Sequence, residues 1–230
     1  MSSWLCRQLI CLSTWACVVC PWLVHADPDQ FFPEEHALYS VDISHEVSDW
    51  SGSGITIETR INRLTLQYAE PISAHIQGGV QLGHETITQT GNSLTEGFQP
   101  NGYFLGLMLT GRYPMSPDWL LAMSAAYTFN NLNDEQTLQQ IRMDWHELGI
   151  DANLTYRYRS LSLLAGVGAR VVDVDEIASG TVNSTRTFRQ SSVGTVRLGL
   201  SFWVDPTGRI GIDVLRGARQ STTLIFERRY

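Results

Sequence analysis

Two short runs of ionisable residues are the part of this sequence best suited to chemistry. Asp144 and His146 lie two positions apart, and Asp173 and Asp175 have the same spacing. A histidine held by carboxylates can act as a general base toward water, and the four side chains together could ligate a metal ion. They match no spacing of a known metal motif, so we expect neither a metal nor a cofactor. The interpretation we favour is a solvated rim without a catalytic role, which leaves enzyme activity open but not expected.

Both runs lie at the ends of segments in which apolar and polar residues alternate. Between positions 145 and 159 the even-numbered residues are mostly apolar, as at Leu148, Ile150 and Leu154, while the residues between them are charged, polar or glycine. A period of two predicts a β-strand with one apolar and one polar face. Helical periodicity is nearly absent after residue 36, so the sequence predicts an all-β fold.

The alternation recurs along the chain and predicts a closed antiparallel up-and-down barrel of about ten strands, with eight as the alternative. In one segment the apolar residues are odd-numbered up to Ile61 and even-numbered from Leu64, which predicts a β-bulge near Asn62 and Arg63. Three connections, at 85–101, 130–143 and 174–187, are predicted to be long polar loops at one end of the barrel. The strands are expected at 37–46, 54–68, 74–84, 102–113, 119–129, 144–158, 161–173, 188–204, 208–216 and 221–230.

The alternation alone does not say which face of the barrel is inside. A soluble barrel turns its apolar face inward, whereas a transmembrane barrel turns it toward lipid. Long loops at one end, short turns at the other and an even number of strands favour the transmembrane case. The polar face is rich in glycine, which leaves room in a narrow lumen for long charged side chains. We expect a lumen charge network of Asp42, Arg63, Glu147, Asp151, Arg157, Arg170, Arg197 and Asp213. The pairs His45-Glu46 and His84-Glu85 lie at the ends of predicted strands and are interpreted as surface residues, as is His36 before the first strand.

The first 26 residues have the layout of a secretory signal peptide. Arg7 is followed by an apolar run that ends in Val24-His25-Ala26, and cleavage is expected after Ala26. All 4 cysteines lie in this segment, so the exported chain is expected to contain no disulfide. Residues 27–36 are then a periplasmic leader, and residues 37–230 form the barrel domain. With a net charge of −7, the chain is not expected to bind nucleic acid.

The end of the chain carries a resemblance to a known class of proteins. Leu224, Phe226 and the terminal Tyr230 resemble the C-terminal assembly signal of bacterial outer-membrane proteins, although Arg228 departs from its apolar alternation. The pattern of residues 37–230 is similar to the OmpA-like family of small barrels. This resemblance implies a place in the outer membrane of a Gram-negative bacterium, in contact with membrane lipid and lipopolysaccharide. It also implies periplasmic chaperones, insertion by the barrel-assembly machinery and loops that face outside.

The function that this pattern favours is a structural or surface-interaction role of a monomeric barrel, carried by extracellular loops and not by catalysis. One alternative is an enzyme, because Asp144 and His146 with Asp173 and Asp175 resemble the Asp–His pair and the Asp pair at the barrel mouth of omptin proteases. The order of the two pairs along the chain is reversed relative to omptins. The other alternative is a narrow passive pore, although a lumen filled by charged side chains leaves little room for one.

Overall fold

The computed structural model describes residues 37–230 except 137 and 191, so the predicted signal peptide with Ala26, the leader and His36 lie outside the described residues. No helix in the described part of the chain has the length and apolarity to cross a membrane. The strands are β1 (Leu38–Gly52), β2 (Ile55–Ser73), β3 (Ile76–Thr90), β4 (Asn101–Ser116), β5 (Trp119–Gln136), β6 (Gln139–Tyr158), β7 (Leu161–Gly180), β8 (Ser184–Gln190), β9 (Gly194–Trp203), β10 (Gly208–Gly217) and β11 (Arg219–Arg229).

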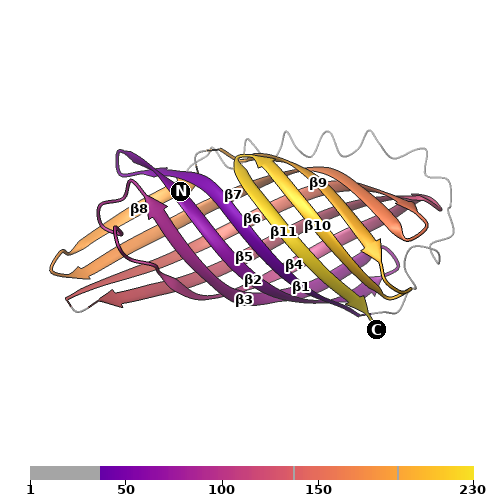
Figure 1. Cartoon of the computed structure of the whole chain (residues 1–230), viewed down its shortest axis with the longest axis horizontal. Coiled ribbons are helices and arrows are strands. Elements are labelled where there is room, and N and C mark those ends of the chain that lie inside the picture. Colours follow the sequence, from indigo (N-terminus) through magenta and orange to yellow (C-terminus); the bar gives the residue numbers. More distant parts are fainter. Residues whose placement is uncertain (1–36, 137, 191) are drawn as a thin grey trace.

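The strands form one closed antiparallel ring (Figure 1). From β1 to β8 each strand pairs with the next, as β10 does with β9 and with β11, and β11 pairs with β1 from Leu38↔Arg229 onward, which closes the ring. β8 and β9 share one place in it, because both pair with β7, β9 along its first half and β8 along its second. The predicted ring of ten positions is therefore confirmed. Closure leaves no unpaired sheet edge in lipid.

The two ends of the barrel differ. At one end, called here the terminal end, Tyr230 donates its backbone N–H to the carbonyl of Ala37. At the other, the extended end, the β5–β6 and β7–β8 hairpins reach beyond the rest of the ring, to the left in Figure 1. There β8 pairs directly with β1 at Trp50↔Gln190, so the extension is itself closed without β9, β10 and β11.

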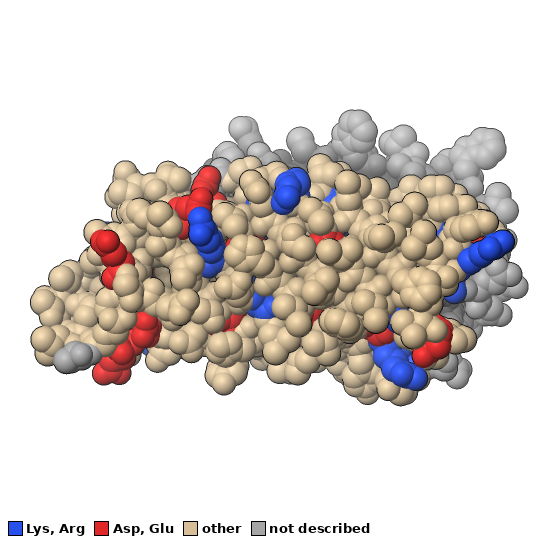
Figure 2. Space-filling view, in the orientation of Figure 1, with Lys and Arg blue, Asp and Glu red and all other residues tan. Residues whose placement is uncertain are grey.

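The middle of the barrel presents apolar side chains outward. On β7, Leu163, Val167 and Val171 are exposed on the outer surface, whereas Arg170, between them, is buried in the lumen. Comparable rows on the other strands form a continuous apolar band, and Figure 2 shows few charged side chains over the middle of the visible face. A closed barrel with such a band is suited to span a bilayer.

Toward the extended end, each strand exchanges the polarity of its two faces. On β2, Leu64 and Leu66 are exposed on the outer face, but Ile57 and Ile61 are buried inside the barrel. The β1–β2 register runs unbroken from Leu38↔Ala69 to Gly52↔Ile55, so the exchange needs no inserted residue. The predicted bulge at Asn62 and Arg63 is wrong. The apolar residues change face at the point where the strand leaves lipid. Beyond that point, toward the extended end, the outer face meets water and the apolar residues face the interior.

The same exchange explains why two predicted loops are strands. Residues 130–143 and 174–187 extend β5, β6, β7 and β8, with pairing that continues to Gln136↔Gln139 and Gln139↔Gly180. Their alternation has the opposite sense to that of the lipid band, with polar residues outward, which is why the sequence predicts polar loops in their place. The third predicted loop, 85–101, is shorter than expected, because β3 continues to Thr90 and only residues 91–100 lack strand structure.

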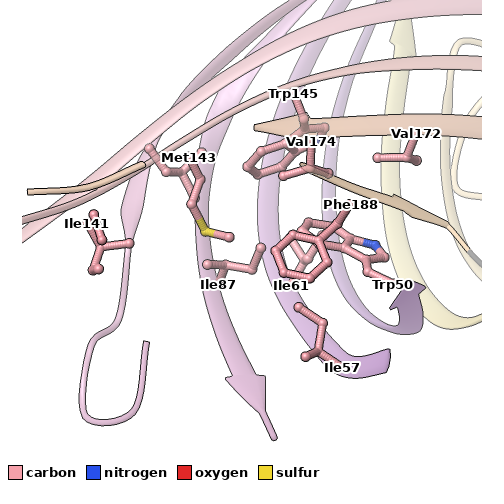
Figure 3. Packing of buried hydrophobic residues seen from close by; sticks show 12 residues of the cluster. Trp50, Ile57, Ile61, Ile87, Ile141, Met143, Trp145, Val172, Val174 and Phe188 are labelled. Atoms are coloured by element: carbon pink, nitrogen blue, oxygen red, sulfur yellow. The ribbon is translucent and has the colours of Figure 1, made fainter. Parts of the chain in front are cut away.

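An apolar plug fills the barrel at the extended end (Figure 3). The rings of Trp50 and Trp145 meet edge to face at 5.8 Å, and the loop 91–100 packs Leu94 and Phe98 against the cluster. Burying one large apolar side chain contributes about 1.5–3 kcal/mol, so the plug is a major source of stability for the extension. It consists of Trp50, Ile57, Ile61, Ile87, Leu132, Ile141, Met143, Trp145, Val172, Val174, Ala178 and Phe188.

We expect truncation in the plug to cost more than truncation on the lipid-facing surface. Phe188 is fully buried, whereas Phe202 is half exposed on the outer face of β9. Phe188→Ala leaves a cavity and should lower the free energy of unfolding by about 3–5 kcal/mol. Phe202→Ala should cost much less in detergent micelles. Urea unfolding of the refolded barrel measures both, and equal losses would contradict the plug.

Candidate functional site

The four residues that the sequence singled out for chemistry are brought together, but on the outer wall of the barrel. The β6–β7 register places His146 opposite Asp173 and Asp144 opposite Asp175. All four side chains lie on the outward face, since their neighbours Trp145 and Val174 are buried in the plug. The structure therefore places them just above the lipid band and not at the mouth of the lumen.

Each of these four residues has a protein partner. The Nδ1 atom of His146 lies 2.5 Å from the hydroxyl of Tyr127. Asp173 pairs with Arg189 at 2.7 Å, and Asp175 accepts a hydrogen bond from Thr187. Asp144 forms an ion pair with Arg142 and accepts a hydrogen bond from Asn131. No group of three metal-ligating side chains suited to a metal occurs among the described residues. These contacts join the four side chains to neighbouring residues on the outer wall.

Inside the barrel, a layer of ion pairs lies directly below the plug. Arg170 pairs with Glu46 of β1 and, at 2.7 Å, with Glu147 of β6. Arg63 of β2 pairs with Glu85 of β3 at 2.8 Å and approaches Glu147 at 3.5 Å. Two of these contacts cross the lumen, because Arg170–Glu46 joins β7 to β1 and Arg63–Glu147 joins β2 to β6, strands that are not neighbours in the ring. Arg219 completes the ion-pair layer through a 3.0 Å contact with Glu46.

The sequence identified only half of this layer. Arg63, Glu147 and Arg170 were predicted to lie in the lumen, but Glu46 and Glu85 were interpreted as surface residues at strand ends. That interpretation is wrong, since Glu46 and Glu85 are buried. The strands continue past them, and both occupy inward positions by the two-residue period.

The other predicted lumen residues are distributed below this layer. Arg197 and Asp213 form an ion pair at 3.0 Å between β9 and β10. Asp42 accepts hydrogen bonds from Gln67 and Ser40 instead of pairing with an arginine at close range. Within the described residues Asp151 lines the lumen without an ion pair inside 4.0 Å. The expected pairing of Asp151 is therefore not found.

Two glycines make room for these carboxylates. A Cβ atom added at Gly168 would lie 2.2 Å from the Oδ1 atom of Asp151, and one added at Gly199 would lie 2.3 Å from the Oδ1 atom of Asp213. Both distances are too short for any side chain. The sequence argument that glycine clears space in the lumen agrees with this geometry, although the groups that use the space are carboxylates and not arginines.

A second cluster, which the sequence did not reveal, closes the lumen near the terminal end. Trp203 is buried and points inward from the end of β9. The guanidinium groups of Arg157, Arg229 and Arg209 lie 4.7, 4.9 and 5.8 Å from its ring centroids. Glu227 pairs with Arg209 at 2.5 Å and with Arg229 at 3.1 Å. The two-residue period of β11 could have revealed this cluster, because it places Glu227 and Arg229 on the inward face on either side of the outward-facing Arg228.

The predicted assembly signal lies on the strand that closes the ring. Leu224 and Phe226 point outward from β11 into the lipid band, and Tyr230 packs edge to face against Tyr39 at 5.6 Å. Its recognition during assembly stays a prediction.

Between the plug and Trp203 the described side chains leave two cavities in the lumen, of about 260 and 220 Å³, both lined in part by charged residues. Asp42, Gln67, Met108 and Arg197 line both cavities, which are therefore adjacent. Along the barrel the lumen thus contains the apolar plug, the ion-pair layer, these cavities and the Trp203 cluster.

Glu176 connects the loop 91–100 to the plug. It is fully buried two residues beyond Val174, and Asn92 donates a hydrogen bond of 2.7 Å to its Oε2 atom. Arg186 donates in turn to the side-chain oxygen of Asn92. Burial raises the pKa of Glu176, and the Asn92 hydrogen bond and the charge of Arg186 offset this only in part. The ionised carboxylate is therefore a cost to the closed loop.

Replacing this carboxyl group should stabilise the loop at neutral pH. The pKa of Glu176 is higher in the folded state, so its favourable contribution is complete below its unfolded pKa, at about 4.3, and is lost as the pH rises through the folded value. Glu176→Gln should slow hydrogen exchange at the amides of Leu94 and Phe98 at pH 7, with no difference from the parent at about pH 4. Faster exchange in the variant at pH 7 would show that the ionised group holds the loop.

The ion-pair layer should be far more sensitive to substitution than the unpaired lumen carboxylate. Arg170→Met leaves Glu46 and Glu147 buried without their main cation, which should cost about 3–5 kcal/mol of unfolding free energy. Asp151→Asn keeps the shape of a group that has no ion pair and should change stability little. Thermal unfolding of the two variants in the same detergent tests the difference. A larger loss for Asp151→Asn would overturn this assignment of the network.

No protein-family model and no curated protein matches the chain. Among solved structures, it is similar to the attachment invasion locus protein Ail of Yersinia pestis, with 16% identity over 86% of this chain and 100% of that chain and a TM-score of 0.41. The translocator domain of the autotransporter NalP from Neisseria meningitidis has 11% identity, coverages of 98% and 95%, and a TM-score of 0.48. The outer membrane protease OmpT from Escherichia coli has 8% identity, coverages of 90% and 99%, and a TM-score of 0.49.

These similarities concern the fold, and membership of the OmpA-like family stays a prediction. The assignment itself rests on the closed antiparallel ring, the apolar band around it and the charged groups inside it. Together these features define a membrane-spanning barrel in which all backbone groups pair within the ring. The chain is a small β-barrel of the bacterial outer membrane.

Proposed function

We propose that this protein is a sealed outer-membrane barrel that presents the outer wall of its extended end as a surface for interaction outside the cell. By the usual topology of such barrels, the extended end then faces outward and the terminal end faces the periplasm. The proposal includes a monomer surrounded by lipid and lipopolysaccharide, delivered by periplasmic chaperones and inserted by the barrel-assembly machinery.

The observation that carries this proposal is the filled lumen. The apolar plug, the ion-pair layer and the cluster around Trp203 follow one another along the barrel. Each layer joins strands that are not neighbours in the ring, so opening a path would require the loss of several buried contacts at once. This arrangement favours a structural barrel over a passive pore.

The wall above the lipid band offers the polar surface for contact. Its strands are paired on both sides, which holds the outward side chains in fixed positions, unlike those of mobile loops. The proposed interaction surface is thus a sheet, not the long loops expected from the sequence. Its outward charged and amide residues include Asp49, Glu58, Arg60, Asn133, Glu135, Arg142, Asp144, Asp173, Asp175 and Arg189.

Conductance distinguishes the sealed barrel from the passive pore. The refolded full chain should insert into planar bilayers without steady current, because the plug and the ion-pair layer block the lumen. A water-filled porin measured in the same bilayers is the positive control. Large and steady single-channel currents from this chain would support the pore instead.

Labelling of neighbouring positions tests the orientation and the wall together. Asn133 is exposed on the outer face of β5, and Leu132, one residue away, is buried in the plug. On intact cells, a membrane-impermeant maleimide should label Asn133→Cys and leave Leu132→Cys unlabelled. Labelling of Asn133→Cys only after the outer membrane is broken would reverse the orientation, and equal labelling of both would contradict a folded wall.

A further inference from the structure

Arg228 interrupts the apolar outer row of the closing strand β11, near the end marked C in Figure 1. Its side chain is about half exposed, and the β1–β11 register places it opposite Tyr39. An arginine on the lipid-facing surface of a barrel costs little near the interfaces and much more at the bilayer midplane. Arg228 therefore marks the level at which lipid headgroups meet the barrel at the terminal end.

A hollow in the outer surface lies beside Arg228. Gly208 is opposite Arg228 on β10, and its missing side chain leaves a gap in this outward row. The next row toward the middle of the band consists of the exposed apolar side chains of Val41, Phe226 and Ile210. The hollow of about 770 Å³ falls within the range of about 300–1,000 Å³ for small-molecule sites. It therefore extends from the headgroup level into the acyl-chain region.

Two opposite charges lie side by side at the headgroup end of this hollow. The Nη2 atom of Arg228 is 3.8 Å from the Oδ2 atom of Asp205, which is longer than a hydrogen bond. The hydroxyl of Thr207 and the backbone N–H groups of Thr207 and Gly208 donate to Oδ1 of Asp205. These hydrogen bonds fix the carboxylate and lower the pKa of Asp205, so it is ionised at neutral pH. The guanidinium group of Arg228 lies 5.5 Å from the ring centroid of Tyr230.

We propose that this hollow binds a zwitterionic phospholipid with a primary ammonium group, such as phosphatidylethanolamine. Its phosphate contacts Arg228, its ammonium group contacts Asp205, and one acyl chain lies along Val41 and Phe226. Adjacent fixed charges of opposite sign complement such a headgroup, whereas an anionic headgroup would meet the Asp205 carboxylate. A trimethylated ammonium group has no N–H to donate to that carboxylate. Only the choice of the periplasmic leaflet rests on the orientation in the proposed function.

Native mass spectrometry of the full chain, refolded in a non-ionic detergent, counts the bound lipid. We expect one phosphatidylethanolamine per barrel, bound more tightly than phosphatidylglycerol or phosphatidylcholine with the same acyl chains. Arg228→Gln should weaken binding about tenfold, because it removes a charge-assisted hydrogen bond. The matched control is Arg159→Gln, since Arg159 also lies over a tyrosine at the terminal end, 5.3 Å from the ring centroid of Tyr158, but outside the hollow. It should leave binding unchanged.

Two further variants separate the carboxylate from the shape of the hollow. Asp205→Asn keeps an oxygen acceptor for the turn but removes the charge, so the preference for phosphatidylethanolamine over phosphatidylglycerol should disappear. Gly208→Val should fill the hollow and weaken the binding of every phospholipid. A Cβ atom at Gly208 lies 3.4 Å from the carboxylate oxygens of Asp205, an ordinary contact that the strand can accept. Heat-modifiable migration verifies that each variant is folded.

Several outcomes would overturn the lipid site. These are equal binding of the three phospholipids, full binding by Arg228→Gln, a preference that survives in Asp205→Asn, tighter binding of lipopolysaccharide, or a dimer that excludes lipid. Because the measurement is made in detergent, it does not depend on which end faces outside. Its failure would leave the sealed barrel and the outer wall of the proposed function untouched, and reversed labelling of Asn133→Cys would change the leaflet but not the binding.

Discussion

The fixed two-residue period of a β-strand is the constraint on which the rest of this structure depends. A paired strand cannot rotate its side chains, so a residue two positions further along faces the same side whether the surroundings are lipid or water. Along β2, β6 and β7 the surroundings change while the period continues. Along these strands the apolar residues therefore move from one face to the other. On β2 the apolar Leu64 faces outward and Ile61 faces inward, and on β6 Leu148 faces outward and Trp145 faces inward.

The layers inside the barrel follow from this exchange. Above the lipid band the inward face is apolar and makes its own core, as in a small soluble barrel. At the level of the band the inward face is polar, and ion pairs there lower the cost of burying its charges. Arg170 holds the first such layer, directly below the plug, and Trp203 with its arginines closes the other end. The seal of the lumen and the fixed outer wall are therefore two results of one arrangement.

The all-β ring and its lipid-facing rows could be predicted from the alternation. The extension could not be predicted, because only segments with their apolar residues in the register of the lipid-facing rows were interpreted as strands. In the extension the apolar residues occupy the other face. For this reason the ends of the β5–β6 and β7–β8 hairpins were predicted as loops, and a bulge was predicted between Ile61 and Leu64. Glu85 was predicted to be a surface residue, although it is buried. Individual ion pairs were also beyond the sequence, since Arg170 meets Glu46 across 124 positions of the chain, and no local spacing encodes such a contact.

The exchange of faces is tested most directly by spin labels placed one at a time along β6. Even-numbered positions from 150 to 154 should be accessible to oxygen dissolved in lipid, and even-numbered positions from 140 to 144 to a water-soluble nickel complex. Odd-numbered positions from 141 to 151 should be shielded from both throughout. Such a result would show one continuous strand that passes from lipid into water. If odd and even positions from 140 to 144 were equally mobile and equally accessible to nickel, this segment would be a loop, and the account of the plug and the wall would be contradicted.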